Sequence, residues 1–86
     1  MLTTPPHVRS VVGRDGGVVL DIDQNLMFSL NVVGSKIWQK LQAALAPEQI
    51  AQDIADEFEL GVEQARADVN AFIEDLRKHR LLTASQ

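Results

Sequence analysis

The chain has 86 residues and a mass of 9.5 kDa, which allows one small domain. Hydrophobic residues make up 45% of it and charged residues 23%, a composition typical of a globular domain with its own core. Cysteine is absent, which excludes disulfides, thiol nucleophiles, iron–sulfur clusters and cysteine-ligated zinc. With only two histidines, the chain also lacks a His-rich metal site, so we expect no metal and no cofactor.

The charge is divided unevenly along the chain, with a net value of −4. Residues 1–47 carry four basic and three acidic side chains, whereas residues 48–86 carry four basic and nine acidic ones. A nucleic-acid-binding surface concentrates positive charge, so the acidic second half disfavours a nucleic-acid partner. It favours a basic peptide or protein, although an acidic surface also serves solubility alone.

The sequence contains no targeting or membrane signal. The first residues, MLTTPPHVRS, have no long apolar run, and no later window approaches the roughly 18 apolar residues of a membrane helix. We therefore expect a cytoplasmic protein without a membrane partner. Pro5 and Pro6 predict a flexible N-terminal arm over residues 1–7, and residues 83–86 are interpreted as a C-terminal tail.

Three short β-strands are predicted in the first third of the chain. Apolar, β-branched runs at residues 8–12, 18–22 and 26–30 are separated by turn-forming Gly, Asp and Asn residues. In the third run, apolar residues alternate with Met27 and Ser29. This alternation predicts a strand with one buried face and one partly solvent-exposed face.

From residue 31 onward the apolar period becomes helical. Asn31 suits the N-cap of a first helix, and Pro47 suits the first turn of a second. A third helix is predicted from about Val62 to Arg80, with basic residues at its end, as the helix dipole prefers. The order β-β-β-α-α-α predicts a single domain over residues 8–82. We expect an α+β, winged-helix-like fold, a three-stranded antiparallel sheet followed by three helices.

Enzyme motifs are missing from the sequence. The glycines lie between predicted strands and open no phosphate-binding loop. A Ser-His-Asp triad would need His7 or His79, which lie near the chain ends, and nothing in the spacing supports it. We therefore predict no catalytic residue. Trp38 and Phe72, which recur at helical spacing, are interpreted as core side chains rather than ligand contacts.

A winged-helix-like fold raises the alternative of DNA binding. The start of the third helix would then enter the major groove, where Gln64 and Arg66 are candidates to read base edges. However, the stretch from Val62 to Asp68 contains one basic and two acidic residues, and it lacks support for phosphate contacts. DNA binding stays a rival hypothesis, together with an interaction domain that dimerises by edge pairing.

The third predicted strand suggests a different activity. An edge strand carries unpaired N–H and C=O groups, which are a template for an incoming extended peptide. Residues 25–30 contain neither lysine nor proline, the usual defences against such pairing. The residues alone leave two interpretations open. Either the third helix covers this edge, or the edge and the helix form a groove that takes a peptide strand.

The sequence resembles the PqqD-like proteins over about residues 8–82. The most specific part is LN-x-x-G-x-x-IW, followed later by a helix with the pattern D-V-x-x-F. The matching stretches are Gly17 to Asp21, Met27 to Gly34, Ile37 to Leu41, Glu48 to Phe58, Asp68 to Leu76, and Leu81-Leu82. This resemblance implies a RiPP recognition element, a domain for ribosomally synthesised and post-translationally modified peptides that does no chemistry itself.

Such domains hold the leader segment of a precursor peptide as an extra strand on the third strand, against the third helix. Leader residues with apolar or aromatic side chains would fill the space between the two, and Asp68 and Asp75 would pair with leader lysines or arginines. Carried over by position, the peptide-binding residues are Asn25, Leu26, Met27, Phe28, Ser29 and Leu30 on the strand and Asp68, Ala71, Phe72, Asp75 and Leu76 on the helix.

Two departures from the family pattern bear on the pathway. Met27 stands where an aromatic residue is more common, which predicts a softer, more adaptable groove. The arginine-containing stretch of the pyrroloquinoline-quinone members is absent between Asp23 and Leu30. The chain is more similar to the stand-alone leader-binding proteins of lasso-peptide biosynthesis. We thus expect a precursor leader peptide and a separate cysteine leader peptidase as partners, with a cyclase as a further candidate. A peptide chaperone for a radical SAM enzyme in quinone biosynthesis is the alternative.

Overall fold

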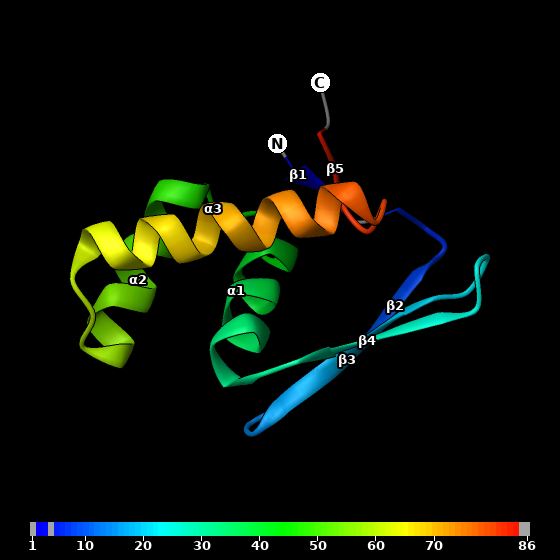
Figure 1. The fold of residues 1–86 in the computed structure, drawn as a ribbon, viewed down its shortest axis with the longest axis horizontal. Helices are drawn as coiled ribbons and strands as arrows, with labels where there is room; N and C mark the ends of the chain where they lie inside the picture. Colours follow the sequence, from blue (N-terminus) through cyan, green and yellow to red (C-terminus); the bar gives the residue numbers. More distant parts are fainter. Residues whose placement is uncertain (1, 4, 85–86) are drawn as a thin grey trace.

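The computed structural model describes residues 2, 3 and 5–84. It confirms the predicted α+β class, with three antiparallel strands followed by three helices (Figure 1). The elements are β1 (Leu2–Thr3), β2 (Val8–Gly13), β3 (Gly16–Asp21), β4 (Leu26–Leu30), α1 (Val32–Gln42), α2 (Pro47–Phe58), α3 (Val62–Lys78) and β5 (Thr83–Ala84). The third helix therefore ends two residues earlier than the sequence predicts, with His79 as its C-cap.

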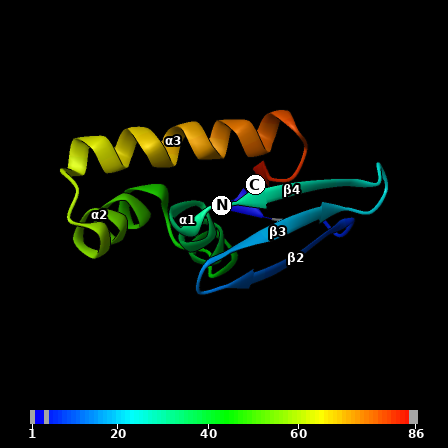
Figure 2. The ribbon, with the colours of Figure 1, turned by 60° about the horizontal axis from the view of Figure 1, so that its bottom comes forward.

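The main sheet pairs its strands in chain order, β2-β3-β4, and all neighbours are antiparallel. β4 therefore lies at one edge of the sheet and β2 at the other. The helices gather on one side of the sheet, and α3 runs along the side on which β4 is the nearest strand (Figure 2). No helix in the described part of the chain is long and apolar enough to cross a membrane.

The hydrophobic core lies between the inner face of the sheet and the three helices. Val19 of β3 is completely buried, and Trp38 of α1 is 1% exposed, which confirms the prediction that Trp38 is a core residue. The other helices bury their apolar stripes against these residues. The buried members of α2 and α3 are Ile50, Ala51, Ile54, Ala55, Ala65, Val69, Ile73 and Leu76.

One residue, Asn31, connects β4 to α1. It is extended (φ −77°, ψ −177°), and its side-chain oxygen accepts a hydrogen bond of 2.7 Å from the backbone amide of Gly34. This satisfies one of the amides that a helix start leaves unpaired, which is why Asn is favoured at this position. The predicted cap is therefore confirmed, and it leaves no loop between the edge strand and the helix.

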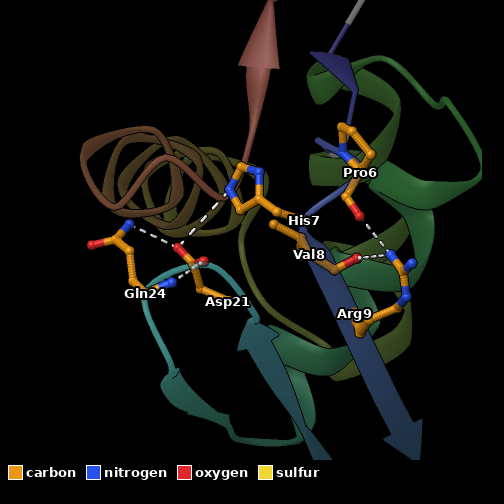
Figure 3. Close-up of polar contacts among 6 residues, drawn as sticks. All are labelled: Pro6, His7, Val8, Arg9, Asp21 and Gln24. Carbon is orange, nitrogen blue, oxygen red and sulfur yellow. Dashed lines mark hydrogen bonds and ion pairs between the residues drawn. The ribbon is translucent and has the colours of Figure 1, made fainter.

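The turn between β3 and β4 is shaped by Asp21, which is 1% exposed (Figure 3). Its carboxylate accepts hydrogen bonds from the backbone amide of Gln24 (3.1 Å) and from the Gln24 side chain (2.8 Å). The imidazole of His7 lies 3.9 Å from the same carboxylate. Asp21, the last residue of β3, therefore stabilises the turn through its side chain.

The chain ends differ from the predicted flexible arm and tail. β1 pairs with β5 in an antiparallel ribbon, with Leu2 opposite Ala84 and Thr3 opposite Thr83. The two paired segments are about 80 residues apart and only two residues long, so neither contains a local sequence pattern that would predict the pairing. The parts of the predicted arm and tail at residues 1, 4, 85 and 86 lie outside the described residues.

Candidate functional site

A groove of about 590 Å³ lies between β4 and α3. One wall comes from the second half of β4 and the start of α1, and the other from α3 and the segment that follows it. Its apolar lining comes from β4, α1, α3 and the segment after α3. These side chains are Phe28, Leu30, Val33, Ile37, Phe72, Leu76 and Leu81.

Most of the predicted peptide-binding residues meet at this groove. The structure brings together Phe28, Ser29, Leu30, Asp68, Phe72, Asp75 and Leu76. The other four predicted residues do not line it. Leu26 is 45% exposed, Met27 is 67% exposed, Ala71 is an exposed residue of α3, and Asn25 lies in the β3–β4 turn with a φ of 56°. A peptide contact at these four positions stays a prediction.

The groove also contains residues that the sequence did not single out. Asn31 and Gly34 lie at its β4–α1 corner, and a side chain on Gly34 would place its Cβ 3.1 Å from the ring of Phe72. Glycine therefore allows this ring to approach α1. The LN-x-x-G motif carried the signal for both residues. His79 and Leu81 follow the end of α3, where no period points to a site.

The ring of His79 lines the groove and packs against Phe28. The two ring centroids are 5.0 Å apart in an edge-to-face arrangement. The Nδ1 atom of His79 lies 2.8 Å from the carbonyl oxygen of Asp75, so this nitrogen donates a hydrogen bond and the ring orientation is fixed. His79, the exposed C-cap of α3, therefore also contacts β4.

The direction of the backbone groups in the sheet follows from one hydrogen bond. The amide of Ile22 donates to the carbonyl of His7 at 3.0 Å, and the register places these two residues opposite each other. Successive residues of an antiparallel pair alternate between turning their N–H and C=O toward the neighbour and away from it. Even-numbered residues of β3 thus face β2, and odd-numbered residues face β4.

This alternation sets which groups of β4 lie at the open edge. Leu26, Phe28 and Leu30 stand opposite odd-numbered residues and turn their backbone groups toward β3. Met27 and Ser29 turn theirs outward. No hydrogen bond in the described part of the chain engages these outward groups. The edge of β4 therefore presents two sets of backbone donors and acceptors beside an apolar groove.

The charge of the groove is negative. Asp68 and Asp75 line it, and no lysine or arginine does. The carboxylate of Asp68 accepts a hydrogen bond of 3.0 Å from the side chain of Gln64. The side chain of Asp75 has no hydrogen bond or ion pair with the described residues. The two carboxylates lie seven positions apart on α3, which places them on one face, two turns from each other.

The two candidate base-reading residues at the start of α3 are engaged within the protein. Arg66 forms ion pairs with Glu48 (3.1 Å) and Glu63 (2.6 Å). The hydrogen bonds that its guanidinium donates to Glu48 and, to a smaller extent, to Glu63 raise the pKa of Arg66. Gln64 donates to Asp68. A phosphate backbone would have to displace carboxylates from Arg66, so this geometry disfavours the DNA-binding alternative.

The described residues contain no group of three or more His, Asp or Glu side chains with the geometry of a metal site. The acidic residues of the groove are separated by apolar side chains. What this arrangement supports is therefore recognition of an extended chain, through backbone groups on one side and side-chain contacts on the other.

Comparisons with known proteins agree with this geometry. A solved structure of TbiB1 in complex with the TbiA(beta) leader peptide is 27% identical and has a TM-score of 0.88, over 98% of both chains. A structure of lasso peptide synthetase B1 complexed with the leader peptide is 23% identical, with a TM-score of 0.88 over 96% of this chain and 98% of that chain. A search of curated proteins finds no significant match.

The structure with 23% identity supports the fold alone. Both alignments extend over nearly the whole chain. The family model of Coenzyme PQQ synthesis protein D (PqqD) matches residues 16–82. This range contains β3, β4 and all three helices, and thus every element that lines the groove. The chain therefore belongs to the PqqD family.

Proposed function

We propose that this protein binds the leader segment of a ribosomally synthesised precursor peptide. The leader adds as a strand to the edge of β4 and lies in the groove against α3. The observation that carries the proposal is the open backbone edge at Met27 and Ser29 beside the groove. The similar TbiB1 structure, which contains a leader peptide, supports the same assignment.

In this mechanism the backbone and the side chains have separate roles. The outward N–H and C=O groups of Met27 and Ser29 hydrogen-bond to the leader backbone, which supplies affinity for any extended chain. Alternate leader side chains then point toward the groove, where Phe28, Phe72 and Leu76 select apolar or aromatic residues. Asp75 at the groove favours a lysine or arginine nearby.

The protein performs no bond chemistry in this proposal. It contains no cysteine, so the cysteine leader peptidase is a separate protein, and a cyclase is a further candidate partner. Holding the precursor near these enzymes raises its effective concentration and accelerates its maturation. Because the precursor is made on ribosomes, the proposal places this step in the cytoplasm.

Amide exchange tests the proposal at residue level. Short open reading frames next to the gene are searched for a precursor, and the synthetic leader of that precursor is titrated into the protein and followed by NMR and calorimetry. We expect the amides of Met27 and Ser29 to gain protection, whereas the outward amide of Ser10 on β2 does not change. A leader that gives no heat and no protection at β4, or the same response from a scrambled leader, would contradict the proposal.

The name of the matching family favours one second candidate, a peptide chaperone in quinone-cofactor synthesis. Its probe is the precursor peptide of that pathway together with the radical SAM enzyme that modifies it. If this peptide binds more tightly than a lasso-type leader and the modification depends on the protein, the second candidate replaces the first. The strand-addition mechanism is the same for both.

A further inference from the structure

The sheet has a second face, turned away from the helices, and this face is apolar. Cross-strand partners share a face, and the register pairs Val11 with Val18 and Leu20 with Met27. Val18 and Leu20 are two residues apart on β3, so the four side chains form one continuous stripe from β2 to β4. Val11 is 69% exposed and Met27 is 67% exposed.

Single exposed apolar residues are normal on a protein surface, but a continuous patch marks an interaction site. The inner face of the same sheet provides the comparison, because Val8 and Val19 there are 5% and 0% exposed. The strand positions of the outer face contain no carboxylate. We refer to the stripe of Val11, Val18, Leu20 and Met27, with Arg9 at its rim, as the outer patch.

The charge at the rim of the outer patch is uncompensated. The guanidinium of Arg9 donates hydrogen bonds to the carbonyl oxygens of Pro6 (2.7 Å) and Val8 (3.1 Å), which hold it at the β2 side of the patch (Figure 3). Arg9 has no carboxylate partner among the described residues. By contrast, four basic side chains of the helices each pair with a carboxylate: Lys36, Lys40, Arg66 and Arg77.

We infer that the outer patch docks a second protein, which presents an apolar surface flanked by carboxylates that meet Arg9. The inference rests on the proposed function, in which the partner is the enzyme that processes the bound precursor. A second copy of this chain is a poorer occupant. A two-fold dimer would set this face against itself, and Arg9 would meet no carboxylate on the facing strands.

The two sites lie on opposite faces of one strand. Phe28 and Leu30 belong to the groove face of β4, and Met27 belongs to the outer patch. A leader on the edge of β4 therefore leaves the outer patch accessible. The enzyme on the outer face and the leader at the edge of β4 bind at the same time, and this arrangement holds the precursor beside the enzyme.

Val11→Asp tests the outer patch, and Val62→Asp is the matched control. Both valines are exposed, but Val62 lies at the start of α3, away from the patch. Each variant is assayed for leader affinity by calorimetry and for the rate at which the purified leader peptidase cuts the full precursor. We expect Val11→Asp to slow cleavage at least about tenfold, as for a central interface residue, with leader affinity within about twofold of wild type. Val62→Asp should change neither quantity.

Arg9→Glu tests the charge at the rim. It should also slow cleavage, because the new carboxylate repels the carboxylates of the partner, and it should leave leader affinity unchanged. Normal cleavage by Val11→Asp with intact leader binding overturns the docking proposal alone. A wild-type dimer in sedimentation velocity that Val11→Asp converts to a monomer assigns the patch to a second copy and overturns it as well. Failure of the wild-type protein to bind the leader overturns the proposed function instead.

Discussion

The two edges of the sheet differ in how far the protein covers them with its own groups. On β2 the outward amide of Val8 donates to the carbonyl of Pro5 (3.1 Å), and the outward carbonyl of Val8 accepts from Arg9. On β4 the outward groups of Met27 and Ser29 have no such partner in the described structure. The chain thus closes part of one edge with its own groups, the usual protection against unwanted pairing, and leaves the other edge unprotected.

The second difference between the edges is what lies beside them. The groove against α3 borders β4, and none of its lining residues comes from β2. An extended peptide on β2 would therefore gain backbone hydrogen bonds without side-chain contacts. Backbone groups at an edge can hydrogen-bond to any extended chain, whereas side-chain contacts with the neighbouring helix determine which chain binds stably. Four substitutions test this distinction.

The largest effect is expected from Ser29→Pro. Proline removes an outward amide of β4 without removing a bond to β3, so the melting temperature should change little. Leader affinity should fall at least about tenfold, because the proline ring also blocks the approaching strand. Ser10→Pro is the matched control, since Ser10 turns its amide outward on β2. If both variants weaken leader binding equally, the two edges are equivalent and the comparison fails.

Phe28→Ala separates the groove from the core. Phe28 is half-buried, so its removal should destabilise the fold by about 1–2 kcal/mol and weaken leader binding about tenfold. Val19→Ala, at a fully buried position on the neighbouring strand, should cost about 2 kcal/mol and leave the leader affinity of the folded protein unchanged. Thermal denaturation and calorimetry measure both quantities. Parallel losses of stability and affinity in Phe28→Ala would mean that the strand is merely core.

A smaller effect is expected from the acidic side of the groove. Exposed ion pairs contribute about 0.2–1 kcal/mol, so Asp75→Asn should weaken a leader that contains lysine or arginine about two- to fivefold. The salt dependence of binding should become shallower at the same time. Asp56→Asn on α2, outside the groove, is the control. An unchanged salt dependence after Asp75→Asn, and likewise after Asp68→Asn, would remove charge from the recognition mechanism.

The smallest effect is expected from Gly34→Ala. The added Cβ would lie 3.1 Å from the ring of Phe72, which is half-buried and has room to shift by a few tenths of an ångström. Alanine also favours the helix by up to about 1 kcal/mol, so the melting temperature should stay nearly constant. Leader affinity should fall about two- to threefold as the ring moves into the groove. A tighter complex would show that the ring position does not limit the groove.

The local elements of the fold were predictable because each carries a local signal. The alternation of residues 26–30 predicts β4 with its exact bounds, and Asn31 and Pro47 predict where two helices begin. The pairing of β1 with β5 was not predictable, since it depends on contact between the two chain ends. Local patterns thus define the elements, and packing defines how distant elements meet.

Only part of the candidate site could be predicted from the sequence, because some of its residues meet only through tertiary packing. Phe72 and Leu76, which the family resemblance implies as site residues, share the helical face that meets β4 and line the groove. Ala71 directly precedes Phe72 in sequence but lies on the exposed side of the helix. His79 lies beyond the last helical turn, and only the tertiary contact with Phe28 brings it into the groove.

The Asn31 junction has a further consequence for any strand that joins β4. Because the helix starts directly after the strand, β4 cannot slide along its own axis, and its outward backbone groups keep fixed positions. A bound peptide that shifts along this ladder must move by two residues to keep the same side chains inward, a step of about 7 Å. In the proposed function, this fixed position also fixes where the bound segment of the leader lies. Under the same proposal, the number of residues between the bound segment and the bond to be cut limits the distance between this domain and the peptidase.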